Sequence, residues 1–131
     1  MREILFKAKW KDNGKWLEGG LCQSTDGRTF LVGVSKKGYI DGLEVIPETI
    51  CQYTGLTDKN GNKIWENDVV EGLFLLGMRI NGVVVFKDGA FGLKWYRGSV
   101  EEFSAFTSVC NVSYEVIGNK FDDPELLKGA V

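Results

Sequence analysis

Alternation of apolar and polar residues with a period of two dominates the chain. In the N-terminal stretch "ILFKAKW", the apolar residues Ile4, Phe6, Ala8 and Trp10 fall on one side and the lysines between them fall on the other. This period is typical of a strand with one buried face, because successive side chains of a strand point to opposite sides of the sheet. Similar apolar runs follow as "WLEGGLC", "TFLVGVS", "VVEGLFLLG", "MRINGVVVFK" and "AFGLKWY". The pattern therefore predicts a protein made of short strands.

The last of these runs shows the two faces most clearly. Phe91, Leu93 and Trp95 are predicted to face inward, and Lys94 and Tyr96 to face outward. The composition "KWYRG" at residues 94–98 is also typical of a surface on which nucleic-acid bases stack. Because Trp95 falls on the inward side, a core aromatic beside exposed cations is the favoured interpretation.

Turn-forming residues separate the apolar runs. The pairs Asn13–Gly14 and Asp88–Gly89 and the segment "STDGR" predict tight connections between antiparallel strands. "LEVIPETICQYT" is expected to be extended, with Pro47 at an edge or at a strand start. In "YEVIGNKF" a bulge is expected at Gly118. The sequence "GAFG" at 89–92 also matches a loop that clamps nucleic acid, but the alternation around it favours a hairpin.

The C-terminal third holds one ambiguous segment and one helix signal. "SVEEFSAFTSV" predicts either a short helix or a strand, with Val100, Phe103 and Phe106 on one side. The tail "DDPELLKGA" predicts a helix of one or two turns, since an Asp cap precedes Pro124 and Gly129 follows as a stop. The fold class is therefore all-β, a small antiparallel barrel or sandwich with a short C-terminal helix. A single domain is expected over residues 1–131.

The composition indicates which cellular compartment and which classes of partner are expected. The formal net charge is −2, which argues against a dedicated DNA-binding protein but leaves room for a local basic patch. The chain has no apolar run of the length that spans a membrane, and its N-terminus lacks the apolar region of a signal peptide. The chain has three cysteines that are far apart in the sequence, namely Cys22, Cys51 and Cys110. An odd number of distant cysteines is a poor basis for disulfides, so we expect reduced thiols that act as small core residues in a cytoplasmic protein.

Histidine is absent from the chain. Its absence excludes the Ser-His-Asp and Cys-His arrangements and the metal sites that depend on imidazole. No CxxC pair is present for a thiolate zinc site, and no phosphate-binding glycine loop is present. We therefore expect a protein that is not an enzyme and that has no metal and no cofactor.

The most distinctive segment is "QYTGLTDKNGNKIWENDVV", residues 52–70. Its "DKNGN" resembles the start of a calcium-binding loop, but the glycine comes two positions early and the twelfth position is Val69 rather than Glu. A corner before a buried strand is the favoured interpretation. Ile64 and Val70 are predicted to be buried, and Asp58 and Asn60 to be exposed in a turn.

Two carboxylates in this segment are candidates for acid–base chemistry or for magnesium binding. Glu66 and Asp68 are two residues apart and would share one face of a strand, but no third ligand is identifiable. Asp68 is expected instead to bond the backbone at the strand entry. The weak candidate binding residues of the chain are Tyr53, Asp58, Asn60, Trp65, Glu66 and Asp68.

Over nearly its whole length the chain resembles the YopX family. The resemblance rests on "MREILFKAKW", "IPETICQYTGLTDKNGNKIWENDVV", "VVVFKDGAFGLKW" and "YEVIGNKFDDPELL". It implies a mostly β fold of SH3-like barrel type and a phage or prophage origin, and it implies no activity. Trp65 stands where the family usually has Tyr, and Asn67 where it usually has Gly. The glycine suggests a left-handed backbone, so Asn67 is predicted to adopt one.

Three functional classes follow from these observations. The favoured class is a non-enzymatic accessory or interaction module that binds an unknown protein partner or itself. The first alternative is a nucleic-acid-binding small barrel, which a contiguous basic face would favour; the residues for such a face are Lys7, Lys9, Lys11, Lys94 and Arg97. The second alternative is a carboxylate-dependent hydrolase, which would need a pocket that converges on Glu66 and Asp68.

Overall fold

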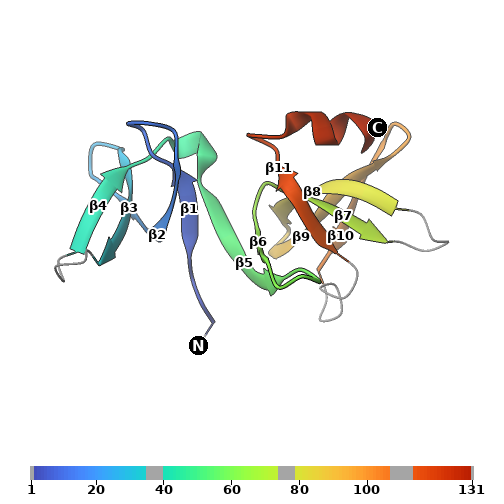
Figure 1. Ribbon diagram of the computed structural model, residues 1–131, viewed down its shortest axis with the longest axis horizontal. Helices are drawn as coiled ribbons and strands as arrows, with labels where there is room; N and C mark the ends of the chain where they lie inside the picture. The colour runs from blue at the N-terminus through green and yellow to red at the C-terminus, as the bar shows by residue number, and fades with distance from the viewer. Residues whose placement is uncertain (1, 35–39, 74–78, 107–113, 131) are drawn as a thin grey trace. The chain divides into compact units, whose positions relative to one another are not determined.

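The computed structural model describes residues 2–34, 40–73, 79–106 and 114–130 of the chain. These residues form two antiparallel β-sheets with two 3-10 helices, so the all-β prediction is confirmed (Figure 1). The chain divides into two compact units, Met1–Tyr53 and Thr54–Val131. The expectation of one domain over the whole chain stays a prediction, because compactness does not decide whether the units fold independently.

The first unit contains four complete strands and the start of a fifth, in the spatial order β4-β3-β2-β1-β5. The strands are β1 (Phe6–Lys9), β2 (Trp16–Gln23), β3 (Thr29–Val34), β4 (Ile40–Glu44) and β5 (Cys51–Thr57), with the 3-10 helix η1 (Pro47–Thr49) before β5. Gly14 and Gly27 lie in the predicted turns with positive φ, at 74° and 90°. Both hairpin predictions are confirmed. The segment around Pro47 is not continuously extended, because η1 interrupts it.

A small apolar core lies on one face of this first sheet. Ala8, Leu31 and Val45 are buried, and other apolar side chains pack against them. The inward face predicted for the N-terminal strand is correct at Ala8 but wrong at Ile4, which is exposed. Ile4 precedes the residues that pair with β2, so no sheet holds it against the core.

The second unit contains the end of β5, the short strand β6 and a five-stranded sheet in the order β10-β9-β8-β7-β11. Its elements are β6 (Lys63–Trp65), β7 (Asp68–Leu73), β8 (Arg79–Lys87), β9 (Ala90–Arg97), β10 (Val100–Ala105), β11 (Glu115–Asn119) and the 3-10 helix η4 (Pro124–Ala130). The predicted turn between β8 and β9 has positive φ at both Asp88 and Gly89. In the ambiguous segment, residues 100–105 form strand β10, and the segment's last three residues, 107–109, lie outside the described residues. The bulge expected at Gly118 is confirmed, because the register with β7 shifts between Val116 and Gly118.

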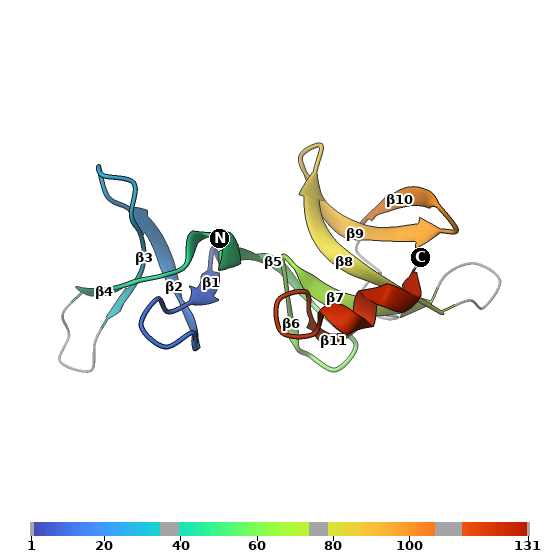
Figure 2. The same cartoon turned by 90° about the horizontal axis from the view of Figure 1, so that it is seen from above.

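The five-stranded sheet has two different faces. One face carries the main core, which contains Ile64, Val70, Val84, Leu93, Trp95 and Tyr114. The other face carries Val83 and Lys94, which are directly opposite each other on β8 and β9. The helix η4 lies against β8 (Figure 2). The sequence prediction that Leu93 and Trp95 face the core is therefore confirmed.

Within the described residues, neither sheet closes into a barrel. The first sheet ends at β4 and β6, and the second ends at β10 and β11. A closed barrel requires its two edge strands to pair with each other, and the observed strand orders leave these strands as edges. The barrel prediction, including the SH3-like type, is therefore wrong. The C-terminal segment forms a 3-10 helix rather than an α-helix, with Leu126 N–H donating to the carbonyl of Asp123 at 3.1 Å. The sandwich alternative stays a prediction.

Candidate functional site

The corner predicted at residues 52–70 is built around a buried carboxylate. Asp58 Oδ1 accepts hydrogen bonds from the N–H groups of Asn60 and Asn62, both at 2.9 Å. Its Oδ2 accepts from Val116 N–H at 2.9 Å. The prediction that Asp58 is exposed is wrong, since only 3% of its surface is accessible. Strand β11, which comes much later in the chain, covers the turn and buries the carboxylate.

The pKa of Asp58 is lowered from its ordinary value. Burial alone raises this pKa, because it penalises the charged form. Hydrogen bonds from Val116, Asn62 and Asn60 favour the charged form and together outweigh the burial. The carboxylate therefore stays ionised and holds the turn against β11.

The second half of the corner behaves as predicted. Ile64 and Val70 are fully buried. Asp68 is 2% exposed, and its Oδ2 accepts from Trp65 N–H at 2.8 Å, so it bonds the backbone at the strand entry. Asn67 has φ of 70°, which confirms the predicted left-handed conformation. Its N–H donates to the carbonyl of Val84 at 2.9 Å, which fixes the corner to β8.

The structure places the candidate binding residues in different surroundings. Asn60 is exposed, as predicted, and its side chain donates to Glu115 at 3.3 Å. Trp65 is part of the core, Glu66 is half-buried, and Tyr53 lies in β5 with its N–H donating to the carbonyl of Leu5. Within the described ranges, no three His, Cys, Asp or Glu side chains lie close enough to hold a metal ion.

Two of the three cysteines lie in the described residues, and both are free thiols. Cys51 is buried, and its Sγ donates to the carbonyl of Thr49 at 3.2 Å. Cys22 is exposed, so the prediction that it is a core residue is wrong. It lies in the exposed end of β2, beyond the part of the strand that covers the small core. Cys110 falls outside the described residues.

The five cations proposed as a basic face are divided between the two units. In the first unit, Lys7 and Lys9 both lie over the ring of Trp16, with Nζ at 4.8 and 5.4 Å from its centroid. Lys11 forms an ion pair with Glu44 at 3.1 Å. These contacts place a cationic and aromatic cluster on one face of β1 and β2.

The remaining two cations of that set lie in the second unit and have partners there. Arg97 lies over the ring of Trp95 at 5.6 Å. Lys94 faces Glu101 at 3.9 Å. The structure therefore defines no single surface for the five cations.

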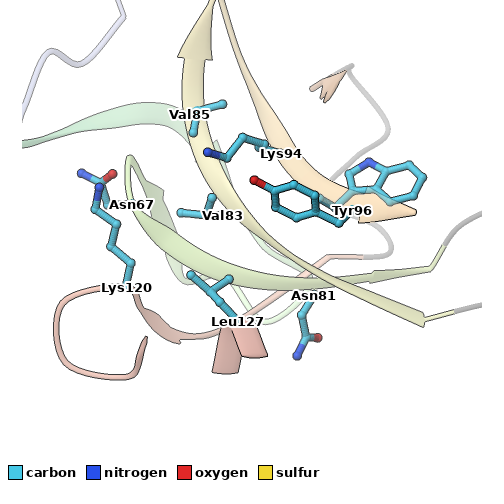
Figure 3. A pocket seen from close by; sticks show the side chains of 9 residues that line it. Asn67, Asn81, Val83, Val85, Lys94, Tyr96, Lys120 and Leu127 are labelled. Carbon is cyan, nitrogen blue, oxygen red and sulfur yellow. The ribbon is translucent and has the colours of Figure 1, made fainter. Parts of the chain in front are cut away.

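Among the described residues, a pocket of about 230 Å³ lies on the face of the second sheet opposite the core. The corner, β8, β9, the end of β11 and η4 contribute its lining, which consists of Asn67, Asn81, Val83, Val85, Lys94, Trp95, Tyr96, Lys120 and Leu127. Figure 3 shows Lys120 and Asn67 on one side of the β8 valines, and Lys94 and Tyr96 on the other. The pocket thus has an apolar floor between two cationic walls.

Local backbone contacts position these side chains. Lys120 N–H donates to the carbonyl of Asn67 at 2.9 Å, so the end of β11 is attached to the corner. Asn81 Nδ2 donates to the carbonyl of Leu126 at 3.4 Å, which connects β8 to η4. Strand alternation directs Lys94 and Tyr96, two residues apart on β9, to the same face as Val83. The pocket therefore combines rigid strand positions with a wall supplied by η4.

One carboxylate reaches the rim of the pocket from β10. Tyr96 Oη donates to Glu101 Oε1 at 3.3 Å, and Lys94 Nζ lies 3.9 Å from the same oxygen. The hydrogen bond to Glu101 and then its charge raise the pKa of Tyr96 above its ordinary value. Tyr96 is therefore a protonated donor, and the donors of this wall already contact a carboxylate.

Sequence reasoning found part of this pocket. It predicted correctly that Lys94 and Tyr96 face away from the core, because alternation on one strand determines that. It missed Asn81, Lys120 and Leu127, which come from three other elements. No local pattern indicates that these elements meet, since their contacts depend on the order of strands in the sheet.

Comparisons with known proteins show the family and the fold. No curated protein matches the chain. Among the described residues, no helix is long and apolar enough to cross a membrane. A solved structure described as protein EF1440 from Enterococcus faecalis is similar, with a TM-score of 0.62 and 22% sequence identity, over 98% of this chain and 100% of that chain. Residues 5–128 match the family described as YopX protein. The chain therefore belongs to the YopX family.

Proposed function

We propose that this protein is a non-enzymatic accessory module that binds a partner protein through the pocket formed by β8, β9 and η4. The observation that carries the proposal is the composition of this pocket. Its apolar floor, with Val83 at 8% exposure, lies between Lys94 and Lys120. Apolar surface combined with a few placed polar groups is typical of sites that recognise a specific ligand.

The corner residues support a non-enzymatic role. Asp58 and Asp68, the buried carboxylates of the segment, accept hydrogen bonds from backbone N–H groups. A carboxylate held in this way positions the chain. A hydrolase built on Glu66 and Asp68 is therefore the least favoured of the three classes.

The biological setting is part of the proposal. The resemblance to phage and prophage proteins supports an origin in a phage or prophage and a site of action in the cytoplasm of the bacterial host. The exposed thiol of Cys22 supports a reducing compartment, since exposed thiols persist where disulfides are kept reduced.

One observation favours a second candidate, a nucleic-acid-binding protein. The cluster of Lys7, Lys9 and Trp16 combines cations with an aromatic ring on a sheet face. Single-stranded nucleic acids bind such surfaces by base stacking and phosphate contacts. In this cluster both ammonium groups already lie over the ring, so a base would have to displace them.

Affinity capture from lysate of a bacterial host tests the proposal, with and without nuclease treatment. The bait is the full-length protein, either unchanged or with Lys120→Glu in the pocket, and Lys87→Glu on the exposed end of β8 is the matched control. We expect the unchanged protein to capture a partner protein even after nuclease treatment. The Lys120→Glu variant should not capture this partner, and the Lys87→Glu variant should. Capture that nuclease abolishes would favour the nucleic-acid candidate, and capture unaffected by Lys120→Glu would exclude the pocket.

A further inference from the structure

We infer that the pocket binds a carboxylate from an acidic segment of the partner protein, and that Glu101 competes with this carboxylate for the same donors. The inference rests on the proposed function and deepens it by naming the ligand chemistry and a device that limits affinity. Lys94 and Lys120 supply ammonium groups, and Tyr96 supplies a hydroxyl, all on one face of the sheet.

Glu101 shows which chemistry these donors accept. Its Oε1 receives the hydrogen bond from Tyr96 Oη at 3.3 Å and lies 3.9 Å from Lys94 Nζ. The carboxylate comes from the neighbouring strand, because Tyr96 and Glu101 are directly opposite each other on β9 and β10. A carboxylate from outside would make the same two contacts, and Lys120 would add a second cation that Glu101 does not contact in the structure.

The contacts of Glu101 are weak enough to be displaced. The side chains of Lys94 and Glu101 are 36% and 50% exposed. Exposed ion pairs of this kind contribute little, because water screens them and both side chains lose freedom. The affinity of the pocket for a ligand is therefore reduced only in proportion to the fraction of molecules in which Glu101 occupies the donors.

The net negative charge of the second unit disfavours a nucleic acid more strongly than a short peptide that carries one carboxylate. Residues 54–131 contain eight Lys and Arg and eleven Asp and Glu, a net charge of −3. A polyanion would meet this excess negative charge at each successive phosphate, whereas a peptide brings one carboxylate to the two lysines. Apolar neighbours of that carboxylate would contact Val83, Val85 and Leu127, which form the apolar part of the lining.

NMR titration of the full-length ¹⁵N-labelled protein tests the inference. The probes are an acetylated and amidated peptide Ala-Leu-Glu-Leu-Ala, the same peptide with Gln in place of Glu, inorganic phosphate and a short oligothymidylate. We expect the Glu peptide to shift the amides of Asn81, Tyr96 and Lys120, with the Gln peptide binding at least about tenfold more weakly, as for a lost charge-assisted contact. Equal binding of the two peptides, or preferential binding of phosphate or of the oligonucleotide, would overturn the carboxylate assignment.

Variants test the role of Glu101 separately. Glu101→Gln should tighten binding of the Glu peptide by about two- to fivefold, since the competitor is worth no more than an exposed ion pair. Glu102→Gln is the matched control, because it removes the same charge from the opposite face of β10 and should leave the affinity nearly unchanged. Lys94→Gln and Lys120→Gln should each weaken binding, and Lys87→Gln should not. Unchanged or weaker binding by Glu101→Gln would overturn the competition.

The outcomes for this inference and for the proposed function can be told apart. If capture of a partner depends on Lys120 but the Gln peptide binds as well as the Glu peptide, the function stands and the carboxylate assignment fails. If the Glu peptide binds in the pocket but capture is indifferent to Lys120→Glu, the proposed function fails.

Discussion

Replacement of the buried Asp58 should strongly destabilise the second unit. Asp58→Ala removes the acceptor of three backbone N–H groups, on Asn60, Asn62 and Val116. The first two lie in an exposed turn where water can replace the carboxylate, so each loss costs about 1 kcal/mol. The donor on β11 is less accessible and costs about 1–3 kcal/mol. We expect the free energy of unfolding to fall by about 3–5 kcal/mol, measured by urea denaturation.

Two further variants make this prediction specific. Asp58→Asn keeps a carbonyl oxygen for the turn but sets an amide donor against the N–H of Val116, so a loss of about 1–3 kcal/mol is expected. Asp26→Asn is the matched control, because Asp26 also bonds its own turn but is exposed, and its replacement should cost much less. Similar losses for Asp26→Asn and Asp58→Asn would refute the argument that burial and the contact with β11 give Asp58 its importance.

The lowered pKa of Asp58 determines the pH dependence. A carboxyl group whose pKa is lower in the folded than in the unfolded state stabilises the fold fully above the unfolded value, which is about 3.9. The contribution is lost as the pH falls below that value and through the folded pKa. The stability difference between the unchanged protein and Asp58→Asn should therefore be constant near neutral pH and should shrink below about pH 4. A difference that grows on acidification would contradict the assigned direction.

Three other predictions follow from the backbone and the thiols. Asn67→Gly should be neutral or slightly stabilising. Asn67→Val should lower the free energy of unfolding by about 1–2 kcal/mol, because a branched side chain disfavours the left-handed conformation. An unchanged free energy of unfolding for Asn67→Val in urea denaturation would contradict this. Gly92→Ala would place a Cβ 2.5 Å from the carbonyl oxygen of Ser104 on β10, so the free energy of unfolding should fall by about 1–3 kcal/mol. Gly33→Ala is the control in the same assay, because its Cβ would meet nothing within 4 Å. Cys22 should react with a thiol reagent in the folded protein, and Cys51 should react only after unfolding. Rapid labelling of Cys51 would contradict this and would show that β5 opens readily. Mass spectrometry of the non-reduced protein should show no intramolecular disulfide.

Local sequence determined most of the strands and the turns between them. Alternation on β9 separates Leu93 and Trp95 from Lys94 and Tyr96 because a strand has a period of two. The turn at Asp88–Gly89 follows from residues that tolerate positive φ. The left-handed conformation of Asn67 is predicted from the resemblance instead, because the YopX family usually has Gly there and Asn is one of the few residues with a Cβ that adopt this conformation readily. The strand faces and the turns depend on neighbours a few positions away.

Contacts between distant parts of the chain decided the rest. By its local sequence Asp58 resembles an exposed turn residue, but β11 covers it in the structure. Nothing in the sequence near residue 58 indicates that β11 packs there. The open sheets arise from the strand order, which leaves β10 and β11 unpaired with each other, so alternation predicted β structure without its closure. The pocket brings together Asn67, Lys120 and Leu127 from three separate segments. Strand order and burial depend on the packing of the whole unit, so the tertiary structure alone places a cationic pocket over β8.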